Sequence, residues 1–124
     1  AARGSLASCN VSPTEVEEVY MGAVLQAGMG QAPARQVALG AEMGNDTPAT
    51  TVNKVCASGM KSVMMAAQSI DLGHRQVMVA GGMEAMSKAP HYAYLRQPTP
   101  YGEHKMLDAI KSDGLTDVYN SMLM

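Results

Sequence analysis

One cysteine lies where the chain is expected to change from a strand to a helix. Cys56 follows the β-branched segment 50–55 and precedes the small residues Ala57, Ser58 and Gly59. The first N–H groups of a helix have no partner within it, and the helix dipole places partial positive charge there. Such a place stabilises a thiolate and can hold the oxyanion that develops on a substrate carbonyl. The position therefore predicts a cysteine nucleophile that accepts an acyl group.

Two other interpretations of Cys56 remain open at this point. A lone cysteine at such a junction is usually a small buried apolar residue. Cysteine catalysis also needs a base, and none is obvious from spacing, because His74 is a helix length away and His91 and His104 fall in a later irregular stretch. A thiol that reacts with peroxide is the third interpretation, although no resolving cysteine is nearby.

The elements that must position Cys56 form a strand–helix–strand unit. Residues 50–55 alternate like a strand, and residues 76–80 are a continuous apolar run, typical of a strand covered on both faces. Between them, one helix face carries apolar side chains at helical spacing, and the opposite face carries Ala66 and Ser69. The apolar face consists of Met60, Val63, Met64, Ala67 and Ile70. The unit predicts parallel strands with Cys56 at a carboxyl end, where doubly wound sheets bind ligands.

Further elements flank this unit. Ser12 and Glu15 predict a capping box on a short helix. A buried strand is expected over residues 18–25, followed by a loop and by a helix over residues 33–43 with Gly44 as its left-handed terminator.

After the last expected strand, the sequence predicts a turn and then an irregular stretch. The turn Gly81–Glu84 is expected to serve close packing, with backbone approach to a ligand as the alternative. From Ala89 onward, prolines and tyrosines predict an irregular excursion, and Met106, Leu107 and Ile110 predict a short helix that ends near Gly114.

Length, composition and charge exclude several classes of protein. The 124 residues suit one small domain, and 47% apolar with 16% charged residues argues against disorder. A net charge of −2 gives no nucleic-acid-binding or membrane surface, and two cysteines build neither a disulfide framework nor a metal site. There are 12 Met but no Phe or Trp. Aromatic residues normally fill a small core, so we expect this chain to be part of a longer one.

Several segments resemble the thiolase family. Its nucleophile segment is similar to residues 52–61, which read Val-Asn-Lys-Val-Cys-Ala-Ser-Gly-Met-Lys. The strand and loop before that segment resemble residues 22–36, and the segment after it resembles residues 80–87. Residues 99–102 and 113–120 resemble its mitochondrial acetoacetyl-CoA type in particular. The resemblance extends over about residues 13–122.

The resemblance implies an α/β fold: part of a layered arrangement, with βαβ units, a mixed sheet and part of an inserted loop domain. On this basis residues 1–11 are an atypical N-terminal segment that does not match the family's opening strand, residues 12–90 are a partial N-terminal domain, and residues 91–124 begin the loop domain.

The resemblance also implies an activity. Cys56 would take an acyl group from a thioester, with its own N–H in the oxyanion site, in the condensation of two acetyl-CoA to acetoacetyl-CoA or in the reverse cleavage of a 3-ketoacyl-CoA. Met124 fits a pantetheine-contacting position, whereas Leu123 replaces the family's histidine. The family's catalytic histidine, asparagine and second cysteine belong to later segments, so we expect the isolated chain to be inactive. The alternative is a non-catalytic truncated product that dimerises or pairs with an intact subunit.

The same resemblance predicts the molecular partners. Acetyl-CoA or acetoacetyl-CoA would be a substrate, with no separate cofactor and no metal. The intact enzyme would be a homotetramer built as a dimer of dimers, with residues 50–55 at the dimer interface and residues 98–101 in the tetramer contact. The expected compartment is the mitochondrial matrix, with the cytoplasm as the alternative.

Overall fold

A three-stranded parallel sheet forms the centre of the computed structural model, which describes residues 1–96 and 101–124. β1 (Glu18–Gly22) lies in the middle, flanked by β2 (Ala49–Val52) and β3 (Met78–Gly82). In register, Met21 of β1 is paired with Thr51 on one side and with Gly81 on the other. The three carboxyl ends therefore meet at one edge of the sheet, as the α/β prediction requires.

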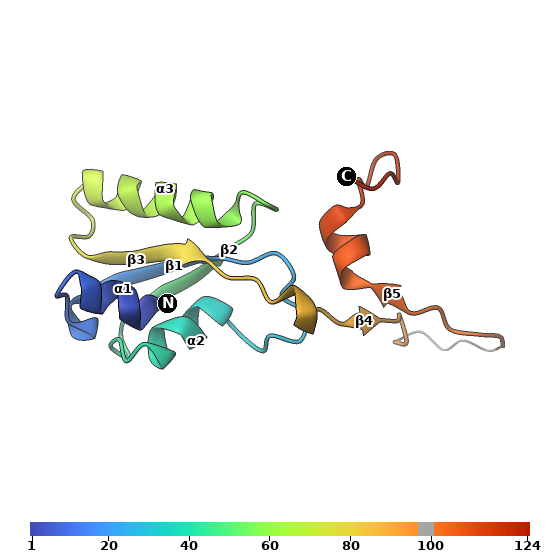
Figure 1. The fold of residues 1–124 in the computed structure, drawn as a ribbon, viewed down its shortest axis with the longest axis horizontal. Coiled ribbons are helices and arrows are strands. Elements are labelled where there is room, and N and C mark those ends of the chain that lie inside the picture. Colours follow the sequence, from blue (N-terminus) through green and yellow to red (C-terminus); the bar gives the residue numbers. More distant parts are fainter. Residues whose placement is uncertain (97–100) are drawn as a thin grey trace.

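Helices cover both faces of this sheet. α3 (Ser58–Asp71) lies on one face, and α1 (Ala2–Ser8) and α2 (Pro33–Gly40) lie on the other (Figure 1). The apolar core is on the side of α1 and α2, where Val19 is completely buried. The other core residues buried on that side are Leu6, Val16, Met21, Ala34, Ala38, Ala41 and Met43.

α3 packs on the sheet through its small residues. Ser58, Ser62 and Ala66 are buried against the strands. The apolar face faces away from the sheet, and Met60 exposes 70% of its surface. The face that carries Ala66, opposite to the apolar face, is thus the one that is buried.

The last described part forms a separate unit beside the sheet. β4 (His91–Tyr92) pairs antiparallel with β5 (Leu107–Asp108), and a π-helical segment, η3 (Ile110–Leu115), follows. This unit lies beyond the carboxyl ends of β1 and β3 (Figure 1). The predicted helix therefore begins later than expected, because Leu107 is in a strand. Pro98 and Pro100 lie outside the described residues.

The main sheet is purely parallel among the described residues, so the expected mixed sheet is corrected to a parallel sheet and a separate antiparallel pair. β3 is an edge strand of half-buried residues, not the doubly covered strand that its apolar run predicts.

Several boundaries also differ from the sequence expectation. β1 ends at Gly22 rather than at residue 25, because the N–H groups of Val24 and Leu25 donate to a side-chain carboxylate. α2 ends at Gly40, and Glu42, with φ 64°, takes the left-handed conformation expected of Gly44. The predicted capping box of Ser12 and Glu15 is confirmed on a three-residue 3₁₀ helix, η1 (Pro13–Glu15).

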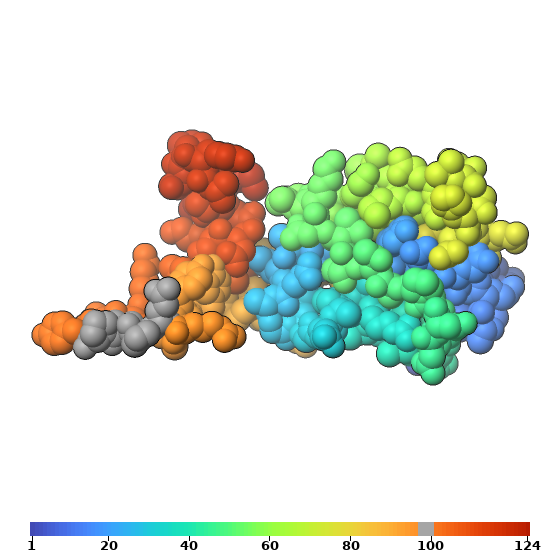
Figure 2. Space-filling model, turned by 180° about the vertical axis from the view of Figure 1, so that it is seen from behind, coloured from blue at the N-terminus to red at the C-terminus, as the bar shows by residue number. Residues whose placement is uncertain are grey.

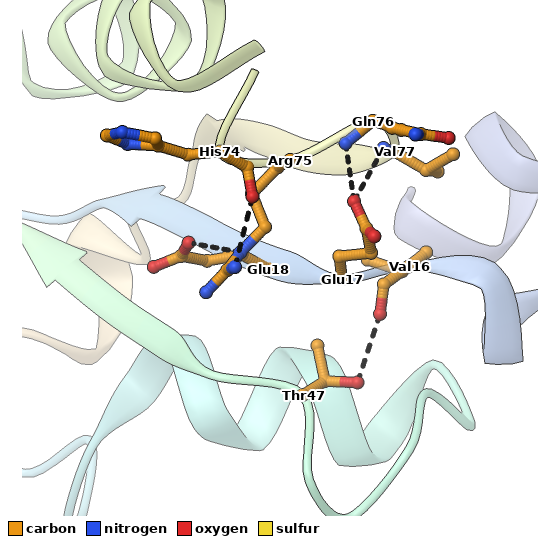
Figure 3. A network of polar contacts seen from close by, with 8 residues as sticks. All are labelled: Val16, Glu17, Glu18, Thr47, His74, Arg75, Gln76 and Val77. Carbon is orange, nitrogen blue, oxygen red and sulfur yellow. Dashed lines mark hydrogen bonds and ion pairs between the residues drawn. The ribbon is translucent and has the colours of Figure 1, made fainter. Parts of the chain in front are cut away.

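A polar network ties together the amino-terminal ends of the strands (Figure 3). The Glu17 carboxylate accepts hydrogen bonds from the N–H groups of Gln76 and Val77, which lower the pKa of this carboxyl below its ordinary value of 4.5. Arg75 pairs with Glu18 at 3.0 Å. This network lies at the end of the sheet opposite to Cys56, so it fixes strand alignment and leaves the carboxyl ends open. In the described residues, none of the helices has the length and apolarity needed to cross a membrane.

Candidate active site

The start of α3 packs directly against the ends of the strands, because three residues at this contact are glycines. A Cβ atom added at Gly22 would lie 2.3 Å from the carbonyl carbon of Ser58, and one added at Gly59 would lie 3.3 Å from the Cα of Gly82. No real Cβ contact is as short as the first of these distances. Glycine at these positions therefore allows the backbone of the helix start to touch the carboxyl ends of β1 and β3.

Cys56 lies at this junction, two residues before α3 begins. Its side chain is exposed and its thiol is free of any disulfide. Ala57 is the N-cap of α3, and the first intrahelical hydrogen bond runs from the Lys61 N–H to the Ala57 carbonyl at 2.8 Å. The predicted helix start beside the thiol is thus confirmed, whereas the interpretation of Cys56 as a buried apolar residue is wrong.

A cavity of about 500 Å³ opens at the same edge of the sheet, and Cys56 lines it. The last residue of β1, Gly22, and Leu25 from the segment after it line one side, and the turn after β3 contributes Met83 and Glu84. The opposite wall is η3, through Ile110, Gly114 and Leu115. Figure 2 shows the hollow between this C-terminal unit and the residues that precede α3. The volume is that of a small-molecule site.

A turn held by side chains leads into Cys56. Val55 has a φ of 49°, in the left-handed region that β-branched residues rarely adopt. The Asn53 Oδ1 accepts a hydrogen bond from the Val55 N–H at 3.0 Å. The Ser58 hydroxyl accepts one from the Lys54 N–H at 2.8 Å and donates one to the Val55 carbonyl at 2.6 Å. β2 consequently ends at Val52, although the β-branched pattern predicts a strand as far as residue 55.

Glu84 joins the two turns on either side of the cavity. Its carboxylate oxygens accept hydrogen bonds from the N–H groups of Val24 at 2.9 Å and Leu25 at 3.0 Å. The segment after β3 thus fixes the segment after β1. The turn Gly81–Glu84 serves close packing, as expected, and its residues also line the cavity.

The cavity is chemically simple. Its lining includes the Cys56 thiol, the Glu84 carboxylate and Ser58 among apolar residues, and no histidine of residues 1–96 and 101–124 lines it. His74 lies in the polar network at the opposite end of the strands (Figure 3), and His91 is an exposed residue of β4. The described residues include no group of three His, Cys, Asp or Glu side chains that could hold a metal ion. The arrangement can accept an acyl group on sulfur without itself supplying a histidine base.

Met124, the second residue that the resemblance assigns to the site, is not among the cavity-lining residues. Its side chain is exposed, and its N–H donates to the carbonyl of Leu115 at 2.9 Å. Met124 is therefore adjacent to a wall residue rather than inside the cavity. Cys9, the C-cap of α1, is exposed and does not line the cavity either.

Sequence reasoning missed four contributors to this site. Gly22 fits a strand pattern, but a glycine in a strand is a known sign of close backbone approach. Asn53 and Ser58 are residue types that form local hydrogen bonds to backbone, which their position beside Cys56 could have suggested. The sequence does predict a short helix that ends near Gly114, which overlaps η3, but nothing in its pattern indicates that this helix forms a wall of the cavity.

Comparison with known proteins gives a consistent result. A family model described as "Thiolase, N-terminal domain" matches residues 1–124. Acetyl-CoA acetyltransferase A, mitochondrial, from Xenopus laevis is 60% identical over 124 residues, which are 100% of this chain and 29% of that protein. The mitochondrial acetyl-CoA acetyltransferase from Homo sapiens is 56% identical over the same shares.

A solved structure agrees with these sequence matches. The Acat5 thiolase from Ascaris suum, crystallised in complex with coenzyme A, superposes with a TM-score of 0.95 at 36% identity, covering 99% of this chain and 32% of that one. The chain thus spans about 29% of the length of the curated relatives it matches.

Proposed function

Because the chain belongs to the thiolase family and matches its N-terminal domain, we propose that it carries the acyl-accepting cysteine of an acetyl-CoA acetyltransferase, and that Cys56 is that cysteine. The observation that carries this proposal is the exposed Cys56 thiol in a cavity at the carboxyl ends of parallel strands, beside the start of α3. Relatives at 56–60% identity are named acetyl-CoA acetyltransferases, which supports the substrate class.

The proposed first step is acyl transfer to sulfur. The Cys56 sulfur attacks the thioester carbonyl carbon of acetyl-CoA, a new carbon–sulfur bond forms, and the bond to the CoA sulfur breaks. CoA leaves as a thiol that carries the proton lost by Cys56. The α-carbon of a second acetyl-CoA, after a base has removed its proton, then attacks the acetyl carbonyl carbon. The new carbon–carbon bond gives acetoacetyl-CoA, the bond to the Cys56 sulfur breaks, and the proton held by the base returns to the Cys56 thiolate. Thiolytic cleavage of a 3-ketoacyl-CoA is the reverse.

The condensation step needs a base that removes the α-proton of the second acetyl-CoA. Among the described residues that line the cavity, Glu84 is the titratable carboxylate, and both its oxygens already accept backbone hydrogen bonds. General acid–base help contributes about 10²–10⁴-fold to such steps. We therefore expect the isolated chain to accept an acetyl group slowly and to turn over little.

The exposed face of α3 supports the proposal that these residues act within a longer protein. Met60, Val63 and Met64 are each at least half exposed, although such side chains are usually buried. A longer protein of the family would cover them. Within it, we propose that CoA is a substrate rather than a resident cofactor, that Met124 contacts the pantetheine arm, and that the subunits assemble as a dimer of dimers.

The proposed compartment follows from the names of the relatives. The matched acetyl-CoA acetyltransferases from Xenopus laevis and Homo sapiens are both named mitochondrial. At 56–60% identity we assign this protein to the same compartment, the mitochondrial matrix, rather than to the cytoplasm.

Acetylation of the chain tests the proposed function. The protein is incubated with excess acetyl-CoA, and the mass of each cysteine peptide is followed over time. We expect the mass of one acetyl group on Cys56 and none on Cys9, which is also free and exposed and so serves as the internal control. The variant Cys56→Ser should lose the label. Equal labelling of both cysteines, or no label on Cys56, would contradict the proposal.

A second candidate function rests on β2. This strand is at an edge of the described sheet, with Thr50 exposed, and an unpaired edge can pair with another chain. A non-catalytic role would be pairing with a second copy or with an intact subunit through β2. Light scattering distinguishes this role, since a monomer at all concentrations would exclude self-pairing.

A further inference from the structure

The residue before Cys56 is held in a conformation that its own side chain disfavours. Val55 has a φ of 49°, and its exposed side chain has no surrounding core to force this backbone conformation. A β-branched residue with positive φ is a strained residue that persists only when neighbouring groups hold it. Something else must therefore keep the chain turned here, directly before the thiol.

Two side chains add hydrogen bonds to a turn that is also closed by the backbone bonds from the Ala57 N–H to the Lys54 carbonyl at 3.1 Å and from the Ser58 N–H to the Val55 carbonyl at 3.0 Å. The Ser58 hydroxyl binds the backbone on both sides of the bend, because it accepts from the Lys54 N–H at 2.8 Å and donates to the Val55 carbonyl at 2.6 Å. The Asn53 Oδ1 accepts from the Val55 N–H at 3.0 Å. Ser58 is only 4% exposed, whereas Asn53 is exposed. The buried hydroxyl has few water molecules to compete for its bonds.

We infer that Ser58 and Asn53 are positioning residues, whose side chains hold Val55 in the left-handed turn and thereby set where the Cys56 thiol lies in the cavity. Neither residue needs to touch a substrate to act in this way. The inference rests on the proposed function, in which Cys56 is the acyl acceptor. It predicts that Ser58 matters only while residue 55 is one that resists the left-handed conformation.

Ser62 provides a matched control on the same helix. It is also buried, with 0% exposure, and its hydroxyl lies 2.7 Å from the carbonyls of Gly59 and Gly81. Ser62→Ala therefore removes a buried serine hydroxyl from the same face of α3, one turn further on, without touching the turn before Cys56. A general loss of helix packing would show in both variants, whereas a loss of thiol positioning would show only in Ser58→Ala.

The test measures two rates at Cys56 in the full chain. One is acetylation by acetyl-CoA, and the other is alkylation by iodoacetamide, with Cys9 as the reference thiol in each sample. We expect Ser58→Ala to slow acetylation of Cys56 about tenfold, and Ser62→Ala to change it less than about twofold. In the Val55→Gly background, Ser58→Ala should have almost no effect, because glycine adopts positive φ freely.

Asn53→Ala is the second variant, in case Ser58→Ala does not fold. Since Asn53 is exposed, this variant should fold, and it should slow acetylation in the same direction by a smaller factor. The inference is overturned if Ser58→Ala and Asn53→Ala leave both rates within about twofold of the parent. It is also overturned if the effect of Ser58→Ala is the same with valine or glycine at position 55.

Failure of the proposed function gives a different result. If acetyl-CoA labels no variant, the acyl-acceptor proposal fails, and alkylation alone decides the positioning inference. Ser58→Ala must then change the alkylation rate of Cys56, but not that of Cys9, and Val55→Gly must abolish the change. Independent effects of the two substitutions on alkylation would overturn the inference.

Discussion

At the scale of single residues, Gly22 is the described glycine at which an added Cβ would come closest to a neighbouring atom. An added Cβ would meet the Ser58 carbonyl carbon at 2.3 Å and the Gly59 nitrogen at 2.5 Å, and both are backbone atoms that cannot rotate away. We expect Gly22→Ala to lower the free energy of unfolding by about 1–3 kcal/mol or more, as overpacking does. Urea unfolding followed by circular dichroism measures this change.

Gly4 supplies the control for that substitution. It lies inside α1, and an added Cβ would meet nothing within 4 Å. Gly4→Ala should raise the free energy of unfolding by about 0.5–1 kcal/mol, because alanine favours a helix interior. If Gly22→Ala behaved like Gly4→Ala, the close contact between the start of α3 and the end of β1 would be refuted.

Cys56 could be predicted from the sequence, whereas the hydrogen bonds that position it could not. Cys56 could be chosen because the junction between strand and helix is a pattern of residue types, and the structure confirms the helix start there. The hydrogen bonds of Ser58 and Asn53 could not be predicted, since they depend on a bend of the backbone that no periodicity records. The same holds for Glu84, whose partners are about 60 residues away along the chain.

At the scale of elements, one hydrogen bond joins β4 to the wall of the cavity. The Tyr92 hydroxyl donates to the Asp113 carboxylate at 2.8 Å, and Asp113 lies in η3. This bond raises the pKa of Tyr92 to about 12, because ionising the phenol would remove the donor and place a second negative charge beside Asp113. Tyr94 packs edge-on against the same ring, with centroids 5.7 Å apart.

The raised pKa of Tyr92 predicts how its contribution to the stability of the fold changes with pH. The neutral phenol is favoured in the folded state, so this contribution to stability is complete below pH 10 and disappears as the pH rises towards about 12. Ultraviolet titration should show a tyrosine that ionises near pH 12, and Tyr92→Phe should remove that step. A titration at high pH that Tyr92→Phe leaves unchanged would contradict the bond.

The extents of the strands show why element boundaries were less predictable than their order. Each of the predicted strands exists, and β2, α3 and β3 follow in the expected order. β1 and β2 nevertheless end early, because Glu84, Asn53 and Ser58 take the N–H groups that longer strands would use. Apolar alternation predicts which residues favour a strand, but it does not reveal competing side-chain acceptors.

At the scale of the whole molecule, the apolar core formed by residues 1–96 and 101–124 lies on one face of the sheet. Apolar residues of α1 and α2 fill the space on that side, whereas α3 lies on the other side with its apolar face outward. A helix whose apolar face points away from the sheet is a surface suited to association. Periodicity alone assigns such a face to the core, and only the close glycine contacts show why the small residues were buried instead.

This arrangement leads to a prediction about charge on α3. Met64 is 50% exposed and Ala66, on the opposite side, is 7% exposed. Met64→Lys should change the free energy of unfolding by less than about 0.5 kcal/mol, since the side chain contributes little to the core of this chain. Ala66→Lys should cost about 3 kcal/mol or more, because it buries an unpaired charge against the sheet.

The same pair of variants reports on association. Met64→Lys should also reduce light scattering by the chain at high concentration, because it interrupts the exposed apolar face. Urea unfolding and light scattering on the two variants together separate folding from association. If Met64→Lys proved as destabilising as Ala66→Lys, the apolar face of α3 would have to be covered within these 124 residues rather than by the rest of a longer protein.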